Sequence, residues 1–245
     1  MFLRTKAFEA IEKIQRLLSF HDPNSDLSIL NQSYSKEVLL NPISIRVLRL
    51  AQAMTHASGG LFNFTVGGKL IDLGVLPNHS KKAVLPSGGA DDLIISGRKV
   101  TLRRPVQITL DGIAKGFAVD AAIDQLKKHR VSGGWVNAGG DLRVFGSVKL
   151  PVSRRESSGF RDLGYLQNSA LATSEILIKA DKRYIGRLVA PDERKLTPEV
   201  WTVKAEFAWK ADALTKVAGL AADAQKMNIV RQLGGEILLH ETVNL

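Results

Sequence analysis

The stretch TLDGIAKGFAVD, residues 109–120, places a carboxylate, two glycines and a lysine at the start of an expected amphipathic helix. Gly112 and Gly116 lie four residues apart there, where unpaired N–H groups and the helix dipole favour an anion. Lys115 adds a positive charge that can reach a phosphate, and Asp111 is of a type that caps helices. A phosphate-binding turn and a capped helix therefore both remain open. Neither GxGxxG nor GxxxxGK(S/T) is present, so this is not a Rossmann or Walker turn.

Residues 137–141, NAGGD, form a second glycine-rich stretch. Gly139 and Gly140 allow positive φ or a close approach of the backbone to a ligand. The alternative is a tight hairpin turn in which Asn137 and Asp141 bond the backbone, and the stretch by itself favours this turn. In both interpretations the flanking residues are expected to form two strands.

The stretch KADALTK, residues 210–216, combines a carboxylate and a hydroxyl on an expected helix. Asp212 and Thr215 are three residues apart, so both side chains can point the same way. Carboxylate and hydroxyl oxygens suit a hard cation such as Mg²⁺, which takes its other ligands from water or phosphate. The alternative is a helix N-cap, which uses the same residue types.

Several other chemistries are not indicated by the sequence. There is no cysteine, so thiolate zinc sites, disulfides and cysteine nucleophiles are excluded, and no lipobox cysteine is present. The histidines show no HExxH spacing, and there is no GxSxG elbow. No apolar run reaches 18 residues, and the first twenty residues are amphipathic, so we expect no signal peptide and no membrane span in these residues.

The chain of 245 residues has a net charge of +10 and a hydrophobic content of 44%, which is typical of a globular protein. A basic surface attracts anionic partners such as nucleotides, nucleic acids or membranes, although it also serves solubility. The basic residues lie in short scattered clusters without an aromatic RNA-binding signature or zinc-finger spacing. Nucleic-acid binding is therefore a minor hypothesis, and no nucleic acid is the expected partner.

The hydrophobic periodicity predicts helices and strands without strict alternation. Helices are expected at 6–18, 44–57, 112–129, 210–222 and 223–233. Strands are expected in a hairpin within 92–102 with its turn at Ser96-Gly97, at 106–110, on both sides of NAGGD, and near 148–153, 169–173, 184–190, 200–208 and 236–240. This order predicts an α+β fold with mixed sheets packed against helices. No linker divides the sequence, so we expect one compact domain over residues 1–245.

The order of the motifs is more specific than any one of them. GLFNFTVGG, LDGIAKGFAVD, VNAGGDLRVFG, ALATS and ADALTK follow one another, and SFHDPNSDLSILN precedes them. In this order the sequence resembles the ApbE family, the FAD:protein FMN transferases, from about residue 8 to about residue 220.

The resemblance implies a Mg²⁺-dependent transferase that cleaves the pyrophosphate of FAD, attaches FMN to a Thr or Ser hydroxyl of an acceptor flavoprotein and releases AMP. Some relatives instead hydrolyse FAD to FMN and AMP, and many are exported. Asp212 and Lys115 would be catalytic. Asp212 and Thr215 would bind the metal, together with backbone oxygen at Gly112. The residues that would contact FAD are His21, Leu61, Phe62, Asn63, Asp111, Lys115, Asn137, Gly139, Gly140, Asp141 and Leu188.

The sequence departs from the family pattern in three places. Where the family reads D-L-G-G-I-A-K-G, Thr109 stands at the first Asp and Asp111 at a Gly. Because side chains of a strand alternate between its faces, we expect Asp111 to take the place of the missing carboxylate. Of the motif H-I-I-D-P, only Pro191 is kept, with Arg187 and Ala190 at the His and Asp positions, and the family's first strand with its M-G-T start has no counterpart. The eroded H-I-I-D-P motif and the unmatched first strand favour, as a second hypothesis, a degenerate member that binds FAD without transferring FMN.

Overall fold

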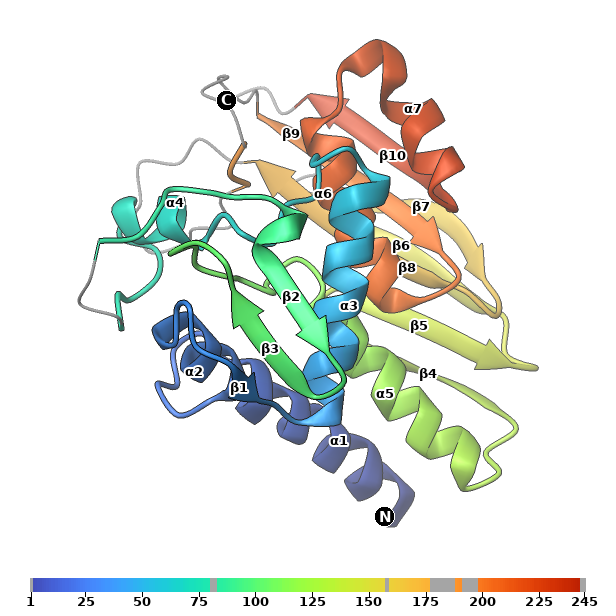
Figure 1. Ribbon diagram of the computed structural model, residues 1–245. Helices are drawn as coiled ribbons and strands as arrows, with labels where there is room; N and C mark the ends of the chain where they lie inside the picture. The colour runs from blue at the N-terminus through green and yellow to red at the C-terminus, as the bar shows by residue number, and fades with distance from the viewer. Residues whose placement is uncertain (1, 80–82, 157–158, 177–187, 191–197, 243–245) are drawn as a thin grey trace. The chain divides into compact units, whose positions relative to one another are not determined.

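The computed structural model describes residues 2–79, 83–156, 159–176, 188–190 and 198–242 (Figure 1). The chain divides into two compact units. The first unit contains residues 1–11, 115–178 and 197–245, and the second contains residues 12–114 and 179–196. Helix α1 (Phe2–Leu18) runs from the first unit into the second. The single domain expected from the sequence stays a prediction.

The first unit is built on a five-stranded sheet with the strand order β10-β9-β8-β5-β4 (Figure 1). Its ladders are all antiparallel. The strands, in chain order, are β4 (Gly133–Ala138), β5 (Asp141–Gly146), β8 (Ala170–Ile176), β9 (Glu199–Ala205) and β10 (Gly235–Thr242). The strands expected at 169–173, 200–208 and 236–240 and on both sides of NAGGD are therefore confirmed.

Both faces of this sheet are covered. Helix α6 (Ala208–Leu220) packs on β8 and β9, and α7 (Asp223–Gln232) packs on β10 and α6. On β5 and β8, apolar side chains meet those of the hairpin formed by β6 (Leu150–Glu156) and β7 (Gly159–Leu166). Strand β9, which lies between β8 and β10 and beneath α6, is buried along nearly its whole length, including Trp201.

Helix α5 (Ala114–Lys128) approaches the start of α6 very closely. A Cβ atom on Gly116 would lie 2.3 Å from the carbonyl oxygen of Ala208, so only glycine fits at this contact. One turn later, Asp120 accepts hydrogen bonds from the backbone N–H groups of Ala208 and Trp209 at 3.0 and 2.9 Å. A side chain of α5 therefore caps the first turn of α6.

The second unit contains a three-stranded antiparallel sheet in the order β1-β3-β2, formed by β1 (Val38–Leu39), β2 (Leu93–Ser96) and β3 (Lys99–Leu102). The hairpin turn consists of Gly97, where φ is +60°, and Arg98, one residue later than the expected Ser96-Gly97 turn, because Ser96 still pairs with Lys99. Helix α3 (Pro42–Ala57) packs on β2, while α2 (Asp26–Gln32) packs on β3. Two short helices, α4 (Gly67–Asp72) and η1 (Ala90–Asp92), complete the unit.

The strand expected at 106–110 is wrong. Of these residues, Gln107 alone forms a bridge, an isolated parallel one with Val66. The backbone is satisfied in another way, because the side-chain amide of Asn31 on α2 bonds both the N–H and the carbonyl of Ile108 at 2.8 Å. The N–H of Thr109 donates to the carbonyl of Phe64 at 2.8 Å. Hydrophobic residues here are buried by helices and loops rather than by a ladder.

The expected helices agree with α1, α3, α5, α6 and α7 to within a few residues. The strand expected near 148–153 is β6, which begins two residues later. Helices α2 and α4 and strand β7 are not expected from the sequence, and the strand expected at 184–190 lies mostly outside the described residues. The α+β class is confirmed. No helix among the described residues is long and apolar enough to cross a membrane.

Candidate active site

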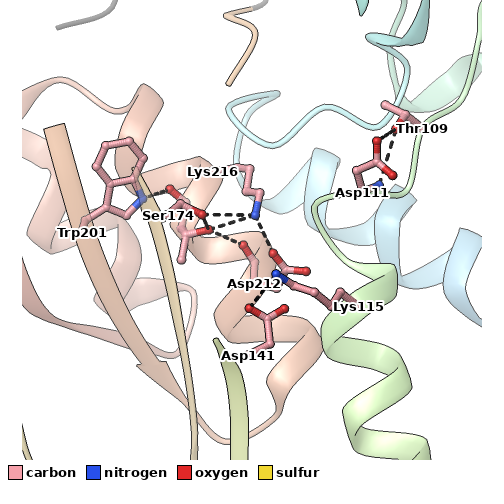
Figure 2. Close-up of polar contacts among 9 residues, drawn as sticks. Thr109, Asp111, Lys115, Asp141, Ser174, Trp201, Asp212 and Lys216 are labelled. Carbon is pink, nitrogen blue, oxygen red and sulfur yellow. Dashed lines mark hydrogen bonds and ion pairs between the residues drawn. The ribbon is translucent and has the colours of Figure 1, made fainter. Parts of the chain in front are cut away.

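Two carboxylates and two lysines of the first unit point toward one another (Figure 2). Asp141 begins β5, Asp212 and Lys216 lie one turn apart on α6, and Lys115 lies in the first turn of α5. We call these four residues the Asp–Lys quartet. Both carboxylate side chains are 2% exposed, whereas those of Lys115 and Lys216 are 47% and 25% exposed. The quartet therefore presents buried acidic groups behind partly exposed ammonium groups.

The glycines of NAGGD set the position of Asp141. Gly139 and Gly140 have φ values of +63° and +100°, and the N–H of Gly140 donates to Oδ1 of Asn137 at 3.0 Å. Ala138 and Asp141 are paired across β4 and β5, so the stretch is the hairpin turn that the sequence favours. Asn137, Gly139 and Gly140 are exposed, and the turn delivers Asp141 into a buried position.

Each carboxylate has one oxygen paired with an ammonium group and one oxygen free. Nζ of Lys216 lies 2.5 Å from Oδ1 of Asp212, and Nζ of Lys115 lies 3.3 Å from Oδ1 of Asp141. The Oδ2 atoms of Asp141 and Asp212 are buried and have no hydrogen-bond partner among the described residues. A buried carboxylate oxygen without a partner is costly, which makes these two atoms candidates for a ligand, a proton or a cation.

Burial and the neighbouring charge of Asp212 raise the pKa of Asp141 to about 7, against the opposing effect of Lys115 and Lys216. A carboxyl group that titrates near neutral pH is more common in functional sites than elsewhere. Burial is the largest cause, so the raised pKa of Asp141 follows from the buried place that the NAGGD turn gives to this side chain.

Thr215 does not point a free oxygen at the quartet in this structure. Its hydroxyl donates to the carbonyl of Asp212 at 2.7 Å and lies 2.7 Å from the hydroxyl of Ser174 on β8. Lys216 also donates to it, at 3.2 Å. A hydroxyl has two lone pairs, so these contacts leave Thr215 no free acceptor for a metal. Its role as a metal ligand stays a prediction, and Asp212 is the member of that pair with a free oxygen.

In the second unit, Thr109 and Asp111 bond each other. The hydroxyl of Thr109 donates to Oδ2 of Asp111 at 3.1 Å, and Figure 2 shows the two side chains facing each other. Thr109 is buried and Asp111 is exposed in the turn before α5. Because these residues do not form a strand, the alternation of faces that predicted the substitution does not apply. The hydrogen bond is a different reason to link the two positions.

The other expected contact residues of the second unit are distributed along loops. Asn63 is used by the fold, since its amide donates to the carbonyl of Gly88 at 3.0 Å and its oxygen accepts from the N–H and hydroxyl of Thr65. Phe62 is buried, Leu61 is partly buried and His21 is exposed. Gly112 lies in the turn before α5, and Leu188 is partly buried. The FAD-binding roles that the resemblance implies for these residues stay predictions.

Three residues of the site region lie within the quoted motifs but received no role from the sequence. Lys216 lies four residues after Asp212, and this helical spacing is the signal that could have identified the ion pair. Ser174 joins Thr215 from another strand, and no local pattern indicates that contact. Asp120, the last residue of TLDGIAKGFAVD, pairs with Arg143 at 2.7 Å and also bonds the start of α6.

A second cluster resembles a metal site only in its residue types. Glu199, Asp223 and His240 bring three ligand atoms close together. The ammonium of buried Lys226 lies 2.9 Å from Glu199, 3.0 Å from Asp223 and 3.2 Å from the imidazole of His240. The lysine is thus the cation of this cluster, and we assign it a role in holding α7 against β9 and β10.

The chain is similar to known proteins along nearly its whole length. A model of the ApbE family matches residues 3–239. The FAD:protein FMN transferase of Vibrio cholerae serotype O1 is 26% identical over 156 residues, which are 59% of this chain and 46% of that relative. The match thus spans about half the length of this curated relative.

Solved structures show the same fold. The apo flavinyl transferase ApbE of Pseudomonas stutzeri gives a TM-score of 0.79 at 17% identity, over 96% of this chain and 84% of that chain. The ApbE protein of Thermotoga maritima gives 0.81 at 22% identity, over 96% and 85%. Because the family model covers nearly the whole sequence, the chain belongs to the ApbE family.

Proposed function

We propose that this protein is a Mg²⁺-dependent FAD:protein FMN transferase. It cleaves the pyrophosphate of FAD, attaches FMN to a Thr or Ser hydroxyl of an acceptor flavoprotein through a phosphoester, and releases AMP. The family membership supports this reaction class. The observation that carries the proposal is the Asp–Lys quartet with its two free carboxylate oxygens.

The quartet fits a Mg²⁺ ion bound together with a phosphorylated substrate. Mg²⁺ is commonly held by one or two carboxylates, with water and substrate phosphates as the remaining ligands. Oδ2 of Asp212 is the buried, free oxygen that we assign to the ion. When bound, the ion would neutralise negative charge on the phosphates during their separation.

The protein groups account for the remaining parts of the reaction. The ammonium of Lys115, on a partly exposed side chain, would pair with phosphate oxygens as charge develops on them. The acceptor hydroxyl oxygen attacks the phosphorus on the FMN side, and the bond from that phosphorus to the bridging oxygen breaks. AMP leaves with the bridging oxygen. The hydroxyl proton passes to the free Oδ2 of Asp141 and then to water.

The residues that the resemblance assigns to FAD complete the proposal. In the first unit, Asn137, Gly139 and Gly140 would offer exposed backbone and amide groups beside Asp141. In the second unit, the proposed FAD contacts are His21, Leu61, Phe62, Asn63, Asp111 and Leu188, and Gly112 would offer its carbonyl oxygen to the metal.

A second candidate function is FAD binding, or FAD hydrolysis, without transfer to a protein. The observation that favours it is that Thr109 places a hydroxyl where the family has a carboxylate. The nearby carboxylate of Asp111 accepts a hydrogen bond from this hydroxyl and does not occupy the position of Thr109. These functions differ in their products. Transfer attaches FMN to the acceptor and releases AMP, hydrolysis releases both FMN and AMP, and binding alone releases neither.

The proposal is tested by incubating the protein with FAD, Mg²⁺ and an acceptor domain that carries a flavinylation site. Intact-mass spectrometry of the acceptor should show an increase of one FMN group, with AMP formed in equal amount. Free FMN with AMP would support hydrolysis instead. FAD binding with none of these products would reject the transferase function.

A further inference from the structure

When both of its carboxylates are ionised, the Asp–Lys quartet is formally neutral. Asp141 and Asp212 each contribute one negative charge, and Lys115 and Lys216 each contribute one positive charge. The carboxylates are nearly completely buried, so their charges interact in surroundings of low polarity. A divalent cation that entered this neutral quartet alone would leave two uncompensated positive charges there, which is strongly unfavourable.

Lys216 is held more firmly than Lys115. Its ammonium contacts Oδ1 of Asp212 at 2.5 Å, the hydroxyl of Thr215 at 3.2 Å and the hydroxyl of Ser174 at 3.4 Å. These contacts involve both residues that the sequence suggested as metal ligands. The ammonium of Lys216 thus lies on donor atoms that a metal would need, while Oδ2 of Asp212 remains free.

We propose that Lys115 and Lys216 are internal counter-ions that prevent a divalent cation from binding alone, so that the cation binds only with a diphosphate group. This inference rests on the proposed function and concerns the order of binding at that site. The two negative charges of a diphosphate diester offset the two charges of the cation. Lysine ammonium groups on flexible stems can turn from the carboxylates to phosphate oxygens. Metal and nucleotide affinity are then reciprocally coupled.

The test uses the whole chain and isothermal titration calorimetry with Mn²⁺ as the probe, in the absence and presence of saturating ADP. The wild-type protein should show no saturable binding of Mn²⁺ alone. With ADP, one Mn²⁺ should bind per chain, with an affinity raised by roughly tenfold or more, as is usual for coupled sites. Titrations of ADP with Mn²⁺ in buffer alone provide the correction for the complex formed in solution.

The variant Lys216→Met makes the charge of the quartet negative and frees Oδ1 of Asp212. It should bind Mn²⁺ without ADP. The matched control is Lys204→Met, which removes the surface lysine that pairs with Glu236 at 3.3 Å and should behave as the wild type. If circular dichroism showed that Lys216→Met is unfolded, Lys115→Met would serve, because that lysine is more exposed and has a single ion pair in the quartet.

Equal affinity of the wild type for Mn²⁺ with and without ADP would overturn the inference, and so would a folded lysine variant that binds no Mn²⁺ alone. A different measurement tests the proposed function. Quenching of flavin fluorescence measures binding of FAD, and its absence at every Mg²⁺ concentration would contradict FMN transfer, whatever the Mn²⁺ titrations show.

Discussion

Nζ of Lys216 lies 2.5 Å from Oδ1 of Asp212, one turn earlier on the same helix, while Oδ2 of Asp212 is buried without a partner among the described residues. The carboxylate is thus oriented by one oxygen and available through the other. This arrangement depends on α6 being held in place, which the contacts of Gly116 and Asp120 on α5 provide.

Gly116→Ala should destabilise the protein, by about 1–3 kcal/mol, because the added Cβ meets the backbone of Ala208 at 2.3 Å and the helices must separate. Chemical denaturation measures the free energy of unfolding. The matched control is Gly134→Ala on β4, whose Cβ would meet the ring of Phe145 at an ordinary 3.5 Å. Equal free energies of unfolding for the two variants would contradict the claim that only glycine fits where α5 meets α6.

Asp120→Ala should cost about 3–5 kcal/mol, since it leaves the buried guanidinium of Arg143 without its carboxylate. It also leaves the N–H groups of Ala208 and Trp209 without their acceptor. Thermal and denaturant unfolding provide the measurement, and Asp124→Ala, an exposed position on the same helix, provides the control. A loss of less than about 1 kcal/mol would contradict the capping role.

Asp141→Asn should change how stability depends on pH. The pKa of Asp141 is raised to about 7 in the folded protein, from an unfolded value of about 4. The folded state therefore holds this proton more tightly, and its stabilising contribution is present below about pH 4 and is lost as the pH rises through about 7. With metals chelated, the free energy of unfolding of the wild type should fall more than that of Asp141→Asn as the pH is raised from about 4 to about 7.

The comparison for this prediction is Asp124→Asn, which alters an exposed carboxylate of the same unit. It should retain the pH dependence of the wild type. If the stability of Asp141→Asn depended on pH as strongly as that of the wild type, the assignment of the raised pKa to Asp141 would be contradicted.

Asp111→Ala should weaken FAD binding by roughly tenfold to a hundredfold, the effect of a lost hydrogen bond to a charged group. This follows if Asp111, bonded to Thr109, supplies the carboxylate that the family has two positions earlier. Flavin fluorescence titrations measure the affinity, and Asp91→Ala, exposed in the same unit, is the control. Unchanged affinity would mean that Asp111 does not replace the missing carboxylate.

The parts of the fold that the sequence predicts are those set by local periodicity. The apolar stripes of α1, α3 and α5 and the alternation around NAGGD each follow from side chains within one element. The stretch 106–110 has the same apolar character as a strand, but Asn31, far away in the sequence, satisfies its backbone. A single-sequence pattern cannot contain that partner.

The candidate site divides in the same way. Asp212, Lys115 and Asp141 stand in motifs whose order is distinctive, so they could be selected from the sequence. That Asp141 is buried and that the hydroxyl of Thr215 is bonded to Ser174 depend on how β5, β8 and α6 pack. The ion pair of Lys216 with Asp212, by contrast, follows from their spacing on one helix. Charge balance in a buried cluster is a property of this packing and has no signature in the spacing of residues alone.

The most direct test of the central claim is FMN transfer by Asp212→Asn compared with the wild type, measured by intact-mass spectrometry of the acceptor. This variant keeps the size of the side chain and removes the charge at the proposed metal ligand. We predict that wild-type protein adds one FMN per acceptor and releases equal AMP, and that Asp212→Asn is slower by about a hundredfold to a thousandfold. Transfer by Asp212→Asn at the wild-type rate would contradict the assignment of the Asp–Lys quartet as the active site.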